Sequence, residues 1–215
     1  MLRNRFTITL FFSVLFTITT FSQKSDTIKL PEPQKTIGKP LMEALNNRQS
    51  SRTFSPAALP LQELSNILWA GFGINRQESG KRTAPSAMNW QEITIYALTA
   101  EGIYTYDAKS NSLTQIVAGD FRKLAGVQPY VKEAPLNLIY VADYSKVKNI
   151  TESDKYMYAG ADAAFIAENV YLYCASQNLA VVVRASIDKK ALGAELKLKP
   201  GQMIVIGQTI GYPKN

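Results

Sequence analysis

Histidine is absent from this 215-residue chain, and cysteine occurs once, as Cys174. Without histidine the chain cannot form a Ser-His-Asp or Cys-His catalytic site. Zinc and non-haem iron sites also lose their commonest ligand, so no metal site is expected. One cysteine excludes an intramolecular disulfide, and its place in an apolar helical pattern predicts a buried thiol. An enzyme of this composition therefore takes its chemistry from an organic cofactor.

The chain also lacks runs of Lys and Arg, internal repeats and low-complexity tracts. Its 24 basic and 17 acidic residues give a net charge of +7, but the basic residues are scattered. This distribution argues against a nucleic-acid partner and suits an anionic cofactor. With 46% hydrophobic and 19% charged residues, the composition predicts an ordinary globular domain.

The N-terminus has the pattern of an export signal. Arg3 and Arg5 precede an uncharged stretch from Phe6 to Phe21, and the small residue Ser22 follows. We predict a signal peptide over residues 1–22, a polar lead-in over 23–39 that acts as a tether or extended arm, and a domain over 40–215. The mature protein is then exported, in the periplasm, without stable membrane insertion. The alternative is a membrane anchor formed by residues 6–22.

Hydrophobic periodicity predicts an α+β fold with a central, mostly antiparallel sheet flanked by helices. Helices are expected after Pro40 and Pro60, and a polar loop over residues 75–83. A strand meander follows over residues 93–117, with a short helix over 121–125 and a buried central strand over 136–142. The longest helix is predicted over 156–176. Strands over 179–183 and 202–207 and a helix over 187–196 complete the order.

Two segments carry candidate chemistry. The first reads Arg-Gln-Ser-Ser-Arg-Thr-Phe from Arg48. In an extended chain, Arg48, Ser50 and Arg52 share one face, and two guanidiniums beside a hydroxyl suit a phosphate monoester. The alternative is a solvated basic stretch after a helix.

The second segment reads Pro-Ser-Ala-Met-Asn-Trp-Gln from Pro85 to Gln91. Pro85 and Ser86 favour a turn, and Ala87 permits close approach. Asn89 and Gln91 offer hydrogen-bond donors and acceptors for the edge of a planar ring. The alternative is an ordinary loop that leads into the strand at Glu92.

Taken in this order, the two segments resemble the nitroreductase superfamily. Arg-x-Ser-x-Arg-x-Phe is similar to its phosphate-binding element, and Pro-Ser-Ala-x-Asn-x-Gln to its ring-edge element. Residues 160–164, 178–186 and the closing Gln-Thr-Ile-Gly-Tyr-Pro resemble further family segments. The resemblance covers residues 41–214. It is closest to the branch containing azoline-oxidising dehydrogenases, because Tyr-Thr-Tyr-Asp at residues 104–107 resembles a hairpin of that branch.

The resemblance implies a homodimer that binds FMN, with the long helix at the subunit interface. The implied cofactor-binding residues are Arg48, Gln49, Ser50, Arg52, Pro85, Ser86, Ala87, Met88, Asn89, Gln91, Arg184, Ala185 and Lys214. Two departures from the family pattern concern this set. Arg184 and Ala185 stand where many members have glycine, and the chain stops at Asn215 without the usual basic tail. Arg184 or Lys214 is therefore expected to replace the missing phosphate ligand.

The implied function is FMN-dependent oxidoreduction, in which hydride passes from a donor such as NAD(P)H through flavin N5. The acceptor is a nitroaromatic, a quinone or a similar conjugated small molecule, and no catalytic side chain is assigned. Three alternatives stay open: a dehydrogenase or oxidase of a peptide-derived or other small substrate, a flavin-binding protein without turnover, and an exported interaction module without a cofactor.

Overall fold

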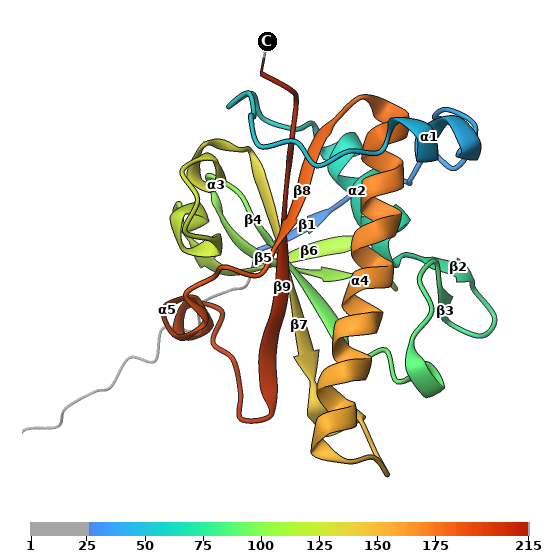
Figure 1. Ribbon diagram of the computed structural model, residues 1–215, viewed down its shortest axis with the longest axis vertical. Coiled ribbons are helices and arrows are strands. Elements are labelled where there is room, and N and C mark those ends of the chain that lie inside the picture. The colour runs from blue at the N-terminus through green and yellow to red at the C-terminus, as the bar shows by residue number, and fades with distance from the viewer. Residues whose placement is uncertain (1–25, 215) are drawn as a thin grey trace, which may run out of the picture.

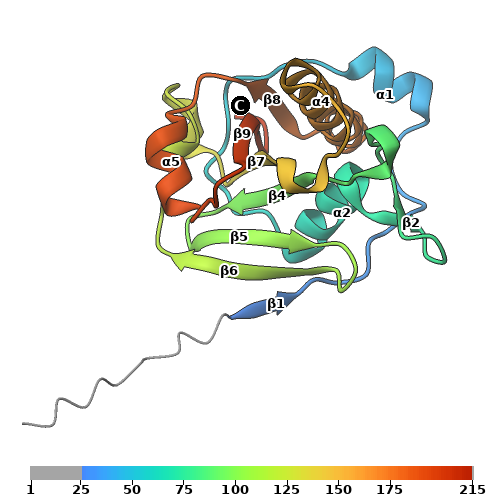
Figure 2. The same ribbon diagram turned by 90° about the horizontal axis from the view of Figure 1, so that it is seen from below.

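A computed structural model describes residues 26–214, which form an antiparallel sheet covered by helices on both faces (Figures 1 and 2). The predicted signal segment, residues 1–22, lies outside the described residues. Every strand pair in the sheet is antiparallel. The strands follow in the order β1 (Thr27–Lys29), β6 (Ser112–Ala118), β5 (Gly102–Asp107), β4 (Ile93–Leu98), β7 (Leu136–Asp143), β9 (Gln202–Gly211) and β8 (Ala180–Arg184).

Two long helices cover one face of the sheet, α2 (Leu61–Phe72) and α4 (Glu152–Gln177), and α1 (Leu41–Asn47) contacts α4. The opposite face packs against shorter elements: the 3₁₀ helix η2 (Arg122–Ala125), α3 (Tyr130–Glu133) and α5 (Lys189–Glu195). Because strand side chains alternate, Leu138 and Tyr140 of β7 face α4, while Ile139 and Val141 face the other layer. The predicted α+β class is confirmed, and β7 is the buried central strand that its apolar run indicated.

The polar lead-in is an extended arm along its described part. Residues Thr27–Lys29 pair with β6, and Leu30 is buried in the core. The Gln34 backbone N–H donates to Asn66 Oδ1 on α2 at 2.8 Å. The arm therefore adds an edge strand to the sheet and packs against the domain.

Two local predictions differ from the structure. The polar stretch over residues 75–83 carries a short hairpin of β2 (Ile74–Arg76) and β3 (Lys81–Arg82). Its pairing comes from a turn at Gly80, where φ is +64°, rather than from apolar alternation. The last strand continues to Gly211, because β9 pairs with both β7 and β8 over that length.

Two of the five small residues near the start of α4 serve packing within the subunit. Ala159 and Ala163 are fully buried against the sheet, where they let the helix approach closely. The exposed side of α4 instead carries Met157, Ala164 and Phe165. Part of the predicted subunit-interface face is therefore core. Cys174 is a free, buried thiol as predicted.

Candidate functional site

The segment after α1 is extended and runs beside the edge strand β8. The helix ends at Asn47, and Arg48 already has extended backbone angles. The Ser51 N–H donates to the Val181 carbonyl at 2.9 Å. Buried Phe54 closes the segment through an isolated bridge to Pro213. Residues 48–53 are thus held at one end by a helix and at the other by an anchored aromatic ring.

Tyr171 of α4 contacts two residues of this segment. Its hydroxyl lies 2.9 Å from Ser50 Oγ, and the Arg48 guanidinium sits 5.4 Å from its ring centroid. The same hydroxyl accepts a hydrogen bond from the Val183 N–H at 2.8 Å. Arg48 and Ser50 therefore share a side of the segment, as their spacing predicts. Sequence patterns could not identify Tyr171, because an aromatic residue in an amphipathic helix looks like ordinary core.

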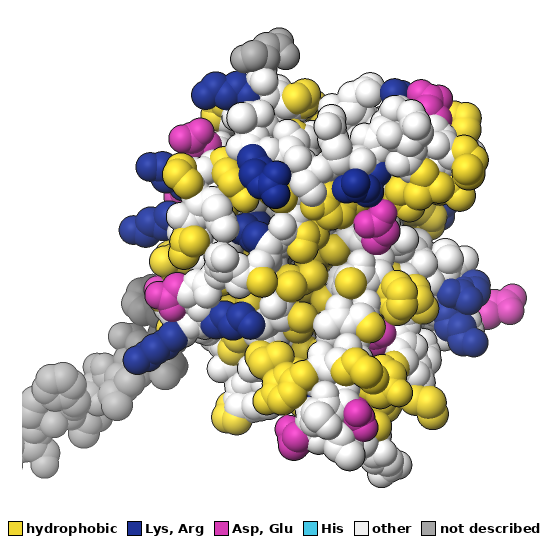
Figure 3. Space-filling model, in the orientation of Figure 1, with side chains coloured by type: hydrophobic (Ala, Val, Ile, Leu, Met, Phe, Trp, Pro, Cys, Tyr) yellow, Lys and Arg dark blue, Asp and Glu magenta, His cyan; other side chains and the backbone are white. Residues whose placement is uncertain are grey.

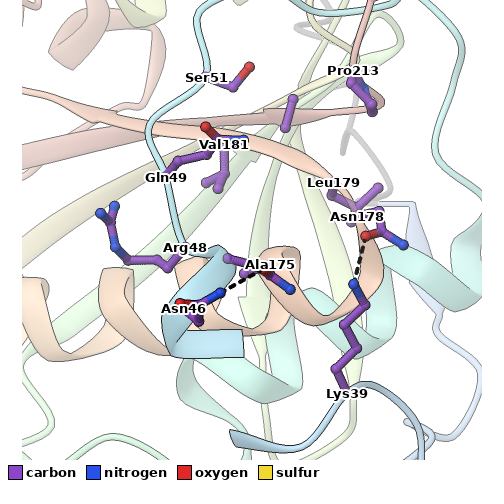
Figure 4. Close-up of a pocket in the computed structure, with 12 residues that line it drawn as sticks. Lys39, Asn46, Arg48, Gln49, Ser51, Ala175, Asn178, Leu179, Val181 and Pro213 are labelled. Carbon is purple, nitrogen blue, oxygen red and sulfur yellow. Dashed lines mark hydrogen bonds between the residues drawn. The ribbon is translucent and has the colours of Figure 1, made fainter. Parts of the chain in front are cut away.

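A cavity of about 570 Å³ opens beside the segment (Figure 4). Arg48, Gln49 and Ser51 line it together with Asn178, which follows α4, and with Lys39 of the lead-in arm. Lys39 Nζ donates to Asn178 Oδ1 at 3.2 Å and pairs with Glu43 at 3.3 Å. None of the lining residues is acidic; they are Lys39, Asn46, Asn47, Arg48, Gln49, Ser51, Ala175, Asn178, Leu179, Ala180, Val181 and Pro213.

The chemistry of this lining fits the phosphate end of FMN. Lys39 and Arg48 supply positive charge, while amide and hydroxyl side chains supply neutral hydrogen-bond donors. Arg52 is exposed on the same segment and free of the core. Lys39 was not predicted as a site residue, and nothing in its sequence context distinguishes it from other surface lysines.

The two candidates for an additional phosphate ligand lie in different surroundings. Lys214 is exposed directly after Pro213, which lines the cavity. Arg184 is 6% exposed and donates to Thr209 Oγ1 at 2.6 Å, the Ala125 carbonyl at 2.7 Å and Asn137 Oδ1 at 3.0 Å. These partners occupy the sheet face opposite α4, so the structure does not bring the Arg184 side chain to the Arg48 segment.

Burial lowers the pKa of Arg184 to about 10, and the nearby Tyr130 and Tyr140 oppose the shift. The guanidinium therefore stays charged at neutral pH. Ala185, the next residue, is exposed just after β8.

The loop from Pro85 to Gln91 has an unusual backbone. Its centre forms the 3₁₀ turn η1 (Ala87–Asn89). Met88, Asn89 and Gln91 all have positive φ, between 48° and 55°, which is uncommon for residues other than glycine. One hydrogen bond lies within the loop, from the Gln91 N–H to Ser86 Oγ at 3.0 Å. Such local strain persists only where the surroundings impose it, and it concentrates at functional sites.

Gln91 and Asn89 differ in their availability to a ligand. The Gln91 side-chain oxygen Oε1 accepts from Arg82 Nε at 2.8 Å. Its amide nitrogen donates to the Gly80 carbonyl at 3.2 Å and to Asn89 Oδ1 at 3.1 Å. Asn89 is exposed, and Met88 projects beside it. Asn89 and the loop backbone are therefore the groups best placed to meet a ring edge, with Gln91 bracing them.

The two candidate segments contact different parts of α4. The Arg48 segment contacts Tyr171, whereas the Ala87 N–H donates to Asp162 Oδ2 at 2.9 Å. Nine residues of helix correspond to about 14 Å along its axis. Within one chain the two segments thus lie at separate levels of α4 (Figure 1).

Residues 26–214 contain no group of three or more Cys, Asp or Glu side chains placed to hold a metal ion. Over the same range, no helix is both long enough and apolar enough to cross a membrane.

Comparisons with known proteins all lead to one family. The model of the Nitroreductase family matches residues 45–212. A crystal structure from Ralstonia eutropha, assigned as a nitroreductase, is 38% identical, with a TM-score of 0.84 over 88% of this chain and 90% of its own. A protein of Methanocaldococcus jannaschii, also assigned as a nitroreductase, is 29% identical over 79% of this chain and 91% of its own.

A more distant structure shares the fold. The NADPH:FMN oxidoreductase from Vibrio harveyi, solved with NAD⁺, is 19% identical, with a TM-score of 0.61. The alignment covers 81% of this chain and 69% of that one.

Proposed function

This chain belongs to the nitroreductase family, and on that premise we propose that it passes electrons from NAD(P)H to a nitroaromatic, quinone or similar conjugated acceptor. As a member of this family it is an FMN-dependent oxidoreductase. The observation that carries the proposal is the Arg48–Ser50 pair on Tyr171, beside a cavity whose lining is cationic and polar without a carboxylate.

The residues divide the task of holding the cofactor. Arg48 and Arg52 neutralise the phosphate, and Ser50 and Gln49 add hydrogen bonds. The exposed Asn89 and the backbone of residues 85–88 meet the polar edge of the ring. FMN held by these residues would supply two-electron hydride chemistry. The protein side chains bind, orient and exclude water, and none of them has to act as an acid or a base.

We propose that two copies of the chain assemble around the cofactor. The separation of the two segments along α4 supports this, because a second copy can present its ring-edge loop to the first copy's phosphate segment. Exposed apolar side chains also favour an assembly, since α1 carries Leu41 and Met42, α4 carries Met157 and Phe165, and the loop carries Met88. Figure 3 shows apolar side chains over the face of the molecule on which α4 lies. Burying such a surface stabilises association.

Export is proposed from residues 1–22 alone, on their charged start and uncharged, Phe-rich continuation. Nicotinamide donors are scarce outside the cytoplasm. For an exported enzyme, the electron donor is therefore the partner to identify first.

The test is the absorption spectrum of the purified full-length chain, followed by anaerobic addition of NADPH or NADH. Flavin absorption that bleaches with either donor and returns with a quinone supports the proposal. A flavin-loaded protein that no donor reduces indicates a binding protein instead. A colourless chain that does not take up added FMN contradicts the proposal.

A further inference from the structure

A buried carboxyl group without a hydrogen-bond donor follows the ring-edge loop. Glu92 is the first residue after Gln91, and its side chain is 0% exposed. No N–H or O–H group in the described part of the chain donates a hydrogen bond to either carboxyl oxygen. A buried, ionised carboxylate in that state is costly, so the group needs either a proton or a partner.

Its neighbour is a second buried carboxyl group. Asp162 of α4 is 2% exposed and adjoins Glu92. One of its oxygens accepts the Ala87 N–H at 2.9 Å. Two adjacent carboxyl groups can bond to each other only when one of them carries a proton. A single shared proton would therefore satisfy both side chains and leave Asp162 free to hold Ala87.

Tyr144 and Lys146 of the 3₁₀ helix η3 (Tyr144–Lys146) are further titratable groups that interact with Glu92. Lys146 donates to the Gln91 carbonyl at 3.1 Å, so its ammonium is fixed to the loop backbone. Burial raises the pKa of Glu92 from 4.5 to about 7. The Asp162 carboxyl adds to the rise, whereas the Glu92 backbone N–H and Lys146 oppose it. Burial likewise raises the pKa of Asp162.

The two carboxyl residues are connected to both ends of the Pro85–Gln91 loop. Asp162 accepts a hydrogen bond from the Ala87 N–H near the start of the loop, and Glu92 is the residue that directly follows the end of the loop. Between these points lie the three residues with positive φ. Loss of the shared proton would leave two buried negative charges side by side. Their repulsion would separate the side chains and loosen a strained loop that depends on its surroundings.

We propose that Glu92 and Asp162 share one proton, and that this protonated pair is the positioning element that holds the Pro85–Gln91 loop in its ligand-binding conformation. The pair acts through the loop and does not touch the reacting atoms. It makes the loop sensitive to pH near neutrality. The consequence for FMN rests on the proposed function, but the proton sharing does not.

Trp90 is a built-in reporter, because it lies in the loop and stacks edge-on against Tyr158 with ring centroids 5.7 Å apart. The chain has two tryptophans, so Trp69→Phe leaves Trp90 as the sole emitter. The experiment follows Trp90 fluorescence of the full chain as purified, between about pH 5 and pH 9. In that background we expect one transition with a midpoint near 7.

Glu92→Gln should remove the transition and keep the low-pH signal, because a glutamine amide donates permanently to Asp162. Asp162→Asn should move the transition to lower pH, because the repelling neighbour is gone. Exposed Glu133→Gln is the matched control and should titrate like the parent. A flat parent profile, or an unchanged midpoint in Glu92→Gln, overturns the proposal. If Glu92→Gln does not fold, an unchanged midpoint in Asp162→Asn overturns it.

The flavin spectrum of the same samples separates this inference from the proposed function. A Glu92-dependent transition in a chain that never binds FMN supports proton sharing between Glu92 and Asp162 and contradicts the proposed function. A chain that binds FMN but shows no pH-dependent change in Trp90 fluorescence supports the proposed function and contradicts the proton sharing.

Discussion

The Tyr171 hydroxyl lies 2.9 Å from Ser50 Oγ, so the central helix fixes the predicted phosphate-binding segment directly. The same hydroxyl accepts from the Val183 N–H, which ties the edge strand β8 to the same point. One side chain thereby sets the position of the segment relative to both the helix and the sheet.

Tyr171→Phe is expected to weaken FMN binding and to lower the free energy of unfolding by about 1–3 kcal/mol, because the Val183 N–H loses its acceptor. Tyr173→Phe is the matched control, since the Tyr173 hydroxyl donates to Glu63 at 2.7 Å on another side of the helix. Denaturant unfolding and FMN titration measure the two effects. Equal FMN affinity in Tyr171→Phe and the parent would show that the hydrogen bonds of the Tyr171 hydroxyl do not contribute to FMN binding.

Arg48→Ala and Arg52→Ala should each reduce FMN affinity by about 30- to 150-fold. This corresponds to about 2–3 kcal/mol for a charge-assisted contact with the phosphate. FMN titration of the apoprotein is the measurement, and Arg76→Ala in the exposed β2 strand is the control. The assignment fails if both variants bind FMN like the parent.

Arg184→Met should lower the free energy of unfolding by about 2–4 kcal/mol, because Asn137 Oδ1 and the Ala125 carbonyl each lose a buried donor. FMN affinity of the folded fraction should not change, since this guanidinium points away from the Arg48 segment. Lys214→Ala should show the opposite pattern, with normal stability and weaker FMN binding. An Arg184 variant that folds normally but loses FMN would contradict the placement.

Phe165→Lys should convert a dimer into a monomer, because it puts a charge into the exposed apolar side of α4. Ala163→Phe should leave the oligomeric mass unchanged. It should instead lower the free energy of unfolding by about 1–3 kcal/mol, because Ala163 is fully buried in the subunit core. Light scattering and denaturant unfolding distinguish the two. A parent protein of monomer mass with FMN bound would count against the assembly.

The stability of the folded chain should fall as pH rises through neutrality. Burial raises the folded-state pKa of Glu92 to about 7 from an ordinary value of 4.5, so the protonated form favours folding. This contribution is fully present below about pH 4.5 and is lost as pH rises through 7. Its size is about 3 kcal/mol, at 1.36 kcal/mol per pKa unit. Urea midpoints at several pH values should therefore decline for the parent and stay level for Glu92→Gln. A rising parent curve over this window would reverse the predicted sign.

The sequence alone was sufficient to predict a structural feature wherever a local pattern has only one physical outcome. A β-rich run and the turn residues after it indicated β4 to β6, and the continuous apolar run identified the buried strand β7. The Arg-x-Ser-x-Arg spacing placed Arg48 and Ser50 on one side because an extended chain alternates its side chains. Motif order identified the family, because two weak signals in the right sequence are more specific than either alone.

The tertiary structure decided everything that depends on contacts between distant residues. Nothing local showed that Arg184 turns into the sheet face away from the site, or that Lys39 reaches the cavity from the lead-in arm. The small residues of α4 could serve a partner or the core, and only packing assigned Ala159 and Ala163 to the core. Tyr171 and the Glu92–Asp162 pair acquire their roles from residues dozens of positions away, and a linear pattern carries no information about such neighbours.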